Sequence, residues 1–198
     1  TPSLLPVDCV DKILKVLDEK IGISSAAEIT FEMDPATFDA KKAKQLSQIG
    51  ITRASLGVQS FTDEILEKCG RAHRVPDIYR AIDDVTNGGI DNFNIDLISA
   101  LPYLSIDQWT STLEAACASG AKHISVYDLQ VEENTAFGRW YNPGVYPLPT
   151  EQDGAEMYRE AVRVLTGPLG GFEHYEVSNY AKISPSPSRS SSSSSSSN

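Results

Sequence analysis

The feature that most constrains the fold is a regular alternation of strand-like and helix-like segments along the chain. Short stretches with apolar residues at every second position are followed by longer stretches with apolar residues three or four positions apart. Each pair takes about 30 to 35 residues, the length at which a helix carries the chain back to a parallel neighbouring strand. The sequence therefore predicts an α/β protein with parallel strands, as an open sheet or a barrel.

The expected elements can be placed by their residue ranges. Helices are predicted at residues 6–20, 39–49, 76–87, 105–119 and 151–165, with a short one ending at Lys68. Strands are predicted at residues 27–32, 53–58, 91–98, 123–129 and, less regularly, 172–177. The clearest alternation puts Phe93, Ile95 and Leu97 on one face and Asn92, Asn94 and Asp96 on the other. Because four regular strands are too few to close a barrel, we expect the domain to begin upstream of Thr1.

Composition narrows the class of protein and of partner. The chain has 198 residues and a net charge of −10, which argues against binding to nucleic acid. No apolar run approaches the roughly 18 residues that a membrane span needs. Three cysteines far apart argue against a disulfide scaffold and favour a reducing compartment. We expect three parts: a core at 1–130, an extension of helix and strand at 131–183, and a disordered serine-rich tail at 184–198.

Polar side chains follow four of the predicted strands, where parallel α/β proteins bind their ligands. Carboxylates and carboxamides at these ends suit the hydroxyls and amines of a nucleoside or an amino acid. Helix capping or loop solvation is an equally good explanation for any single residue, but four strand ends together favour a site. The residues concerned are Glu32 with Asp34, Gln59, Asn94 with Asp96, and Tyr127, Asp128 and Gln130.

Two further groups of residues leave alternatives open. Arg71 and Arg74 flank His73, and an arginine there could clamp a carboxylate or could stabilise the end of the preceding helix. His174 lies between two glutamates and could act in acid–base chemistry or pair with one of them. The spacing of Cys9, Cys69 and Cys117 predicts no metal site made by this chain alone.

Several sequence blocks in the same order resemble the oxygen-independent coproporphyrinogen III oxidase family of radical S-adenosylmethionine (SAM) proteins. Two later blocks, at residues 128–135 and 174–180, are more similar to its HemW branch of haem chaperones than to its HemN branch of oxidases. The opening Thr-Pro-Ser is similar to the end of the family's GGGTPS motif. The blocks are EITFEMDP at 28–35, RASLGVQSF at 53–61, CGRAH at 69–73, NIDLI at 94–98 and HISVY at 123–127.

The resemblance implies a partial radical SAM (β/α) barrel that lacks its first strand–helix unit. It also implies SAM as a cofactor and either haem or coproporphyrinogen III as a partner. Gln130 falls where the family makes its contact mainly through the backbone. The positions that match SAM-binding residues of the family are Thr1, Glu32, Gln59, Arg71, Asp96 and Gln130.

The sequence departs from the family in one respect that bears on activity. Members hold a 4Fe-4S cluster through a CxxxCxxC motif, which this chain lacks and which would lie upstream of Thr1. The resemblance implies that the 5′-deoxyadenosyl radical is not formed without that cluster. Three alternatives remain: a fragment of a radical SAM oxidase or chaperone, inactive by itself; a non-catalytic module that binds SAM or a tetrapyrrole; and an inactive, unstable partial domain. The sequence leaves the cytoplasm, the mitochondrion and the chloroplast open as locations.

Overall fold

One sheet organises the protein in the computed structural model, which describes residues 1–183. Its strands lie in the order β1-β2-β3-β4-β6-β5. Strands β1 to β4 are parallel, and β6 and β5 form an antiparallel hairpin at the β4 edge. The strands are β1 (Thr30–Met33), β2 (Arg53–Gln59), β3 (Phe93–Ser99), β4 (His123–Asp128), β5 (Phe172–Glu176) and β6 (Asn179–Lys182). The predicted α/β class with parallel strands is confirmed, and the sheet is open within the described residues.

The last strand was missed by the sequence pattern. The predicted strand at 172–177 corresponds to β5, but β6 is the strand that pairs with β4, with Ile124 opposite Tyr180. β6 has only four residues, too few for a recognisable alternation. Its position is set by pairing with β4 and β5. The predicted extension at residues 131–183 thus adds the β5–β6 hairpin to the same sheet as β1 to β4. The predicted disordered tail lies outside the described residues.

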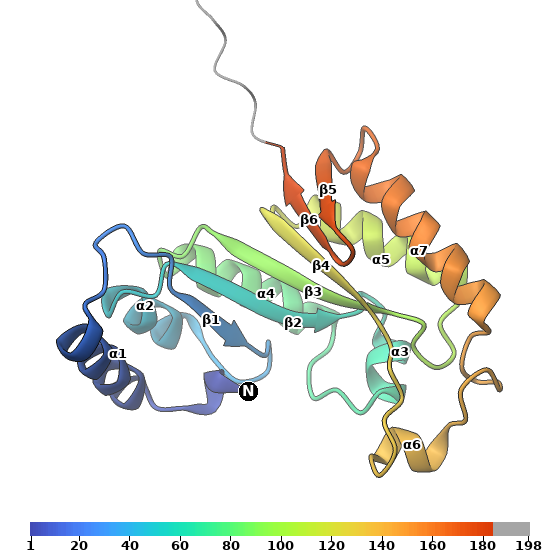
Figure 1. The fold of residues 1–198 in the computed structure, drawn as a ribbon, viewed down its shortest axis with the longest axis horizontal. Helices are drawn as coiled ribbons and strands as arrows, with labels where there is room; N and C mark the ends of the chain where they lie inside the picture. The colour runs from blue at the N-terminus through green and yellow to red at the C-terminus, as the bar shows by residue number, and fades with distance from the viewer. Residues whose placement is uncertain (184–198) are drawn as a thin grey trace, which may run out of the picture.

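Helices cover one face of this sheet, as Figure 1 shows for α2, α4, α5 and α7. The predicted helices are all present, within a few residues of their predicted bounds, and one short helix, α6, falls in the long connection before α7. Within residues 1–183, no helix is long and apolar enough to cross a membrane. The helices are α1 (Val7–Ile21), α2 (Ala40–Gln48), α3 (Asp63–Lys68), α4 (Val75–Asn87), α5 (Ile106–Ala118), α6 (Ala136–Trp140) and α7 (Glu151–Thr166).

The start of α5 shows how the sequence sets a helix boundary. Ser105 caps the helix, accepting a hydrogen bond from the backbone N–H of Gln108. The Gln108 side chain in turn accepts one from the backbone N–H of Ser105. This reciprocal pair satisfies two of the donors that a helix leaves unpaired at its N-terminus. It aligns the helix so that Trp109 and Leu113 are buried.

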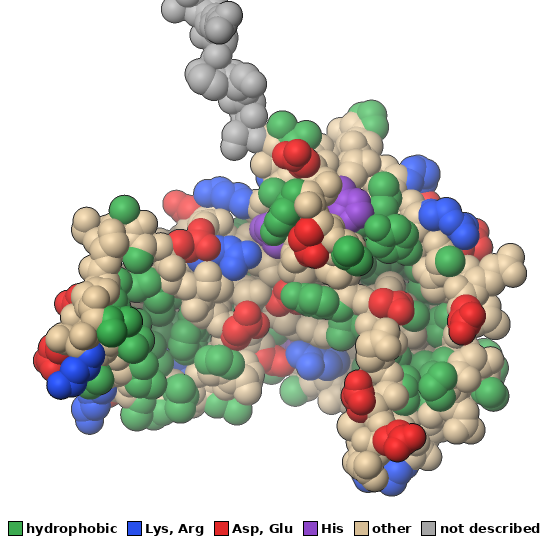
Figure 2. Space-filling view, viewed as in Figure 1, with side chains coloured by type: hydrophobic (Ala, Val, Ile, Leu, Met, Phe, Trp, Pro, Cys, Tyr) green, Lys and Arg blue, Asp and Glu red, His purple; other side chains and the backbone are tan. Residues whose placement is uncertain are grey.

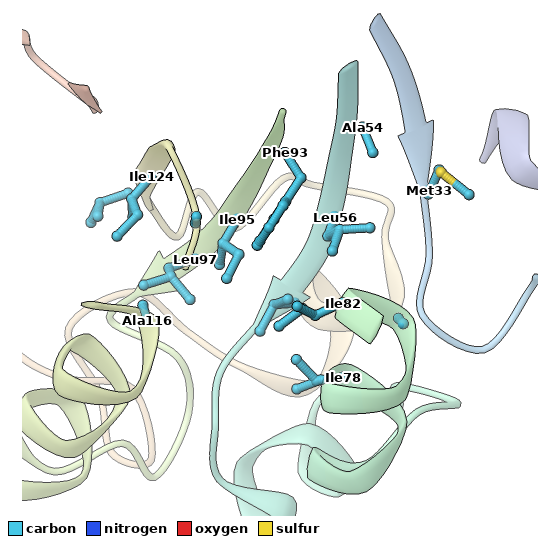
Figure 3. Close-up of a cluster of buried hydrophobic side chains, with 14 of the residues drawn as sticks. Met33, Ala54, Leu56, Ile78, Ile82, Phe93, Ile95, Leu97, Ala116 and Ile124 are labelled. Carbon is cyan, nitrogen blue, oxygen red and sulfur yellow. The ribbon is translucent and has the colours of Figure 1, made fainter. Parts of the chain in front are cut away.

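The two faces of the sheet differ in chemistry because side chains alternate along each strand. The apolar set packs under the helices, and Figure 3 shows Leu56, Phe93, Ile95 and Leu97 together with helical side chains. The other set is polar and faces away from the helices. In Figure 2 charged side chains lie in the hollow of this second face. The alternation predicted for β3 is therefore confirmed, and it leaves a polar surface free for a ligand.

Candidate functional site on the polar face of the sheet

A ladder of small polar side chains crosses the middle of the polar face. Ser55 on β2, Asn94 on β3 and Ser125 on β4 are at most 4% exposed. Parallel pairing puts Ser55 opposite Asn94 and Ser125 opposite Asp96, and Asn94 Nδ2 reaches Ser125 Oγ at 3.2 Å. These side chains form the floor of the candidate site.

Hydrogen bonds in this floor converge on Asp96. Ser55 Oγ donates to Asp96 Oδ2 at 2.8 Å, and Asn94 Nδ2 donates to Asp96 Oδ1 at 2.6 Å. One oxygen of the carboxylate is thus oriented from the neighbouring strand β2 and the other from β3 itself.

Glu32 on β1 shares a hollow of about 510 Å³ with Asp96. Burial, followed by the negative charge of Asp96, raises the pKa of Glu32, while the positive charge of Arg53 opposes the shift. Two carboxylates in one hollow attract a cationic ligand and disfavour their own simultaneous ionisation. The hollow is lined by Glu28, Glu32, Arg53, Ser55, Asn92, Asn94, Asp96, Lys122, His123, Ser125, Tyr127, Tyr175 and Asn179.

Arg71 reaches the carboxyl ends of β1 and β2. Its Nη2 donates to Asp34 Oδ2 at 2.6 Å and to the Gly57 carbonyl at 3.3 Å. His73 is fully buried beside it, with Nε2 at 3.1 Å from the Val58 carbonyl and Nδ1 at 3.5 Å from Asp34 Oδ1. Arg71 is thus paired with a carboxylate of the protein itself.

Gly57 leaves space between Gln59 and Arg71. A Cβ atom at Gly57 would lie 3.2 Å from Gln59 Nε2 and 3.7 Å from Arg71 Nη2. Gln59 has a φ of +69°, which is unusual for a residue with a side chain. Such a conformation at the end of a strand is typical of functional sites. Gln59 and Arg71 therefore border the same small cradle.

Thr1 is connected to this end of the sheet through Ser3. The two hydroxyls lie 3.1 Å apart, and Ser3 Oγ accepts a hydrogen bond from the backbone N–H of Asp34 at 3.1 Å. Ser3 is fully buried, whereas Thr1 is exposed. The structure thus places Thr1 near the carboxyl end of β1, one residue removed from direct contact with Asp34.

Gln130 lies apart from the other predicted site residues. Its side chain lines a second hollow, of about 530 Å³, next to Asp128 and Tyr158. Gln130 Nε2 lies 3.5 Å from Asp128 Oδ2. Side chains of β4 alternate between faces, and Asp128 points to the face opposite that of Tyr127. The side chain of Gln130 therefore does not join Glu32 and Asp96 in one hollow.

Sequence reasoning missed His123 and Tyr175. His123 Nδ1 lies 2.6 Å from Asn94 Oδ1, and His123 Nε2 lies 2.8 Å from the Tyr175 hydroxyl. Burial, followed by the positive charge of Arg53, lowers the pKa of His123. The alternation of β4 could have placed His123 on the polar face, but nothing local indicated that the hairpin would bring Tyr175 onto it.

His174, on the same hairpin, packs within it. Its ring stacks on Tyr180 with a centroid distance of 4.4 Å and an interplanar angle of 9°. His174 Nε2 lies 3.3 Å from the Val177 carbonyl. These contacts give His174 a structural place in the hairpin.

The family uses two groups, SAM and an iron–sulfur cluster, and the residues of the polar face suit them differently. SAM carries positive ammonium and sulfonium groups, which suit Glu32 and Asp96, and a carboxylate, which suits an arginine. Arg71 fits that second role because its Nε is buried and has no partner within residues 1–183. The polar face thus fits SAM.

The same residues do not fit an iron–sulfur cluster. Cys9, Cys69 and Cys117 are free, and burial raises the pKa of the Cys69 thiol to about 11, away from the thiolate that binds iron. In the part of the chain that the structure describes, no three His, Cys, Asp or Glu side chains are grouped to hold a metal ion. These thiols therefore do not form a ligand set for a cluster.

The chain is similar in sequence to several known proteins. The haem chaperone HemW of Synechocystis is 44% identical over 92% of this chain, and HemW of Escherichia coli is 34% identical over 92%. A zebrafish protein named radical S-adenosyl methionine domain-containing protein 1, mitochondrial, is 31% identical over 92%. The chain covers 44%, 47% and 40% of these three proteins, so it spans less than half of their length.

A solved structure supports the fold. The coproporphyrinogen III oxidase HemN of Escherichia coli, described as a radical SAM enzyme, superposes with a TM-score of 0.82 at 24% identity. The superposition covers 92% of this chain and 41% of HemN. The model of the radical SAM superfamily matches residues 2–116, which include β1 to β3 and most of α5. The resemblance expected from the sequence blocks is thereby confirmed, and the chain belongs to the radical SAM superfamily.

Proposed function

We propose that the polar face of the sheet binds SAM, and that the chain is part of a radical SAM protein of haem or porphyrin metabolism. One observation carries the proposal: Glu32 and Asp96, from β1 and β3, share a hollow in which Asp96 is oriented by Ser55 and Asn94. Two carboxylates on a preorganised floor suit a ligand with positive charges and hydroxyl groups.

The other proposed contacts surround the carboxyl ends of β1 and β2. Arg71 and Gln59 would hold SAM beside Gly57, where a side chain would intrude. Thr1 would contribute from the start of the chain, and Gln130 through its backbone. In the superfamily, SAM supplies a 5′-deoxyadenosyl radical when an iron–sulfur cluster reduces it. The residues of this chain would bind and orient SAM, and their role ends there.

The proposed metabolic context depends on the relatives. HemW is named a haem chaperone, and HemN a coproporphyrinogen III oxidase. Haem and coproporphyrinogen III are therefore the tetrapyrroles to test as partners. A bacterial cytoplasm and an organelle are both compatible with relatives from bacteria and with one named mitochondrial.

We expect the isolated chain to bind SAM without cleaving it. Reductive cleavage needs a cluster, and the CxxxCxxC motif is not among these residues. A non-catalytic module that binds SAM or a tetrapyrrole is thus the second candidate function. The fit of the polar face to SAM, together with the scattered cysteines, favours it for this chain alone.

Calorimetry with SAM tests the binding site. Asp96→Asn removes one negative charge from the hollow and should weaken SAM binding about tenfold or more, as expected for a hydrogen bond to a charged group. Asp83→Asn is the matched control, because Asp83 is exposed on α4. If the folded wild-type chain binds no SAM, or if both variants bind equally well, the proposed site is wrong.

Cleavage needs a separate experiment. A version extended upstream to the length of the Synechocystis relative should, after anaerobic reconstitution with iron and sulfide, show cluster absorbance and cleave SAM. The chain of residues 1–198 treated in the same way should do neither. SAM cleavage by the shorter chain would refute its proposed inactivity, and an extended protein that binds neither iron nor SAM would refute the functional assignment.

A further inference from the structure

The hydrogen bonds around Asn94 have only one consistent direction. Asn94 Nδ2 faces the carboxylate of Asp96 at 2.6 Å, and a carboxylate accepts, so this end of the amide is the donor. Asn94 Oδ1 therefore faces His123 Nδ1 at 2.6 Å as an acceptor. His123 Nδ1 must then carry a proton.

The second nitrogen of His123 has its partner on another element. In a neutral imidazole with a proton on Nδ1, Nε2 is an acceptor, and the Tyr175 hydroxyl lies 2.8 Å from it. The Tyr175 O–H thus donates to His123, His123 donates to Asn94, and Asn94 donates to Asp96. The hairpin of β5 and β6 is connected in this way to a carboxylate on the floor of the proposed SAM site.

An asparagine amide can rotate by half a turn and exchange its two ends at little cost in shape. The rotated amide would direct Oδ1 at the carboxylate of Asp96 and Nδ2 at the N–H of His123, so both hydrogen bonds would be lost. Asn94 is 2% exposed, so water gives little compensation. Asp96 and His123 thus fix the amide, one at each end, and Ser125 Oγ, at 3.4 Å from Oδ1, is a longer second donor to it.

We infer that His123 is a positioning residue for the SAM site: through Asn94 it orients the carboxylate of Asp96, and Tyr175 of the hairpin sets its tautomer. The inference rests on the proposed function and extends it to a residue that acts on Asp96 through Asn94. It also gives the β5–β6 hairpin a part in the site, although the hairpin lies at the far edge of the sheet from β1.

Three substitutions at or near position 123 test the inference in the full chain with SAM as the probe. His123→Leu removes the donor and should weaken SAM binding about tenfold. His123→Gln retains an N–H donor and should restore most of the affinity. Tyr175→Phe frees Nε2 to carry the proton and should weaken SAM binding about threefold, since only part of the population takes the other tautomer.

A double-substitution cycle separates positioning from general damage. In the Asp96→Asn background, His123→Leu should cause no further loss of SAM affinity, because there is no carboxylate left to orient. An equal loss in both backgrounds, or a folded His123→Leu variant that binds SAM like the wild type, would overturn the inference.

A spectroscopic measurement needs no ligand. The ¹⁵N shifts of the His123 ring should show the tautomer with the proton on Nδ1 in the wild type and a shift toward the other tautomer in Tyr175→Phe. A wild-type ring protonated on Nε2 would refute the inference even if His123→Leu failed to fold. If the wild type shows the expected tautomer but binds no SAM, the proposed function fails, while the hydrogen-bond chain remains.

Discussion

At the scale of single residues, Glu32 and Asp96 differ in their surroundings although they share one hollow. Both carboxylate oxygens of Asp96 accept hydrogen bonds, one from Ser55 and one from Asn94. Glu32 lies in the same hollow, and burial and the charge of Asp96 raise its pKa. Two carboxylates this close destabilise the ligand-free protein and favour the binding of a positively charged ligand, as is common at binding sites.

The raised pKa of Glu32 predicts how SAM binding and stability vary with pH. SAM affinity should fall as the pH is lowered through that pKa, because neutral Glu32 no longer attracts a positive charge. The folded state holds this proton more tightly than the unfolded state, so the stability that the shift provides is present at low pH and is lost as the pH rises through the folded pKa. Glu32→Gln should therefore weaken SAM binding yet raise the free energy of unfolding at pH 8, by roughly 0.5 kcal/mol or less because solvent screens the site.

Calorimetry at a series of pH values and urea unfolding at pH 8 measure the two effects. Glu114→Gln, on the exposed face of α5, is the matched control and should change neither. An affinity for SAM that is the same in the Glu32→Gln variant and the wild type across this pH range would contradict the assignment of Glu32.

At the scale of elements, α5 and α7 are connected by one buried side chain. Trp109 is fully buried on α5, and its indole Nε1–H donates to the Met157 carbonyl of α7 at 2.9 Å. The bond crosses between two helices that cover the β3–β4 side of the sheet (Figure 1). The packing of α7 thus depends on a contact 48 residues apart in sequence.

Trp109→Phe should lower the free energy of unfolding by about 1–3 kcal/mol, through the lost hydrogen bond and the space left by the smaller ring. SAM affinity should be unchanged, because the polar face lies on the other side of the sheet. Trp140→Phe is the control, since Trp140 is 64% exposed on α6. Chemical unfolding followed by circular dichroism measures both variants, and equal stabilities would show that the contact contributes nothing.

At the scale of the whole molecule, the two edges of the sheet are unlike. The hairpin covers the β4 edge, whereas within residues 1–183 β1 pairs with β2 alone. Beside it, α1 buries Val10 but exposes Ile13, Val16, Leu17 and Ile21. Figure 2 shows apolar side chains gathered at this end of the molecule, near α1. Exposed apolar surface of this extent favours association.

The chain should therefore self-associate reversibly as its concentration rises, and Val16→Lys should reduce the association severalfold without lowering the melting temperature. Val145→Lys is matched to it, because Val145 is 56% exposed, similar to the 53% of Val16, but lies in the connection before α7. Sedimentation velocity over a range of concentrations measures the effect. A wild-type chain that stays monomeric throughout would contradict this prediction.

The sequence by itself determined the features that depend on local repeats of apolar and polar residues. The alternation of β3 separated Leu97 from Asp96 and so predicted both the core and the polar face, because side-chain direction repeats every two residues in any strand. Matching sequence blocks identified the superfamily and pointed to Glu32, Gln59, Arg71 and Asp96.

Only the tertiary structure decided which of these groups meet. It paired Arg71 with Asp34, placed the side chain of Gln130 in a second hollow, and brought Tyr175 onto His123. The physical reason is that such contacts depend on strand order and on the antiparallel return of β6, which arise from packing between distant segments and leave no local pattern.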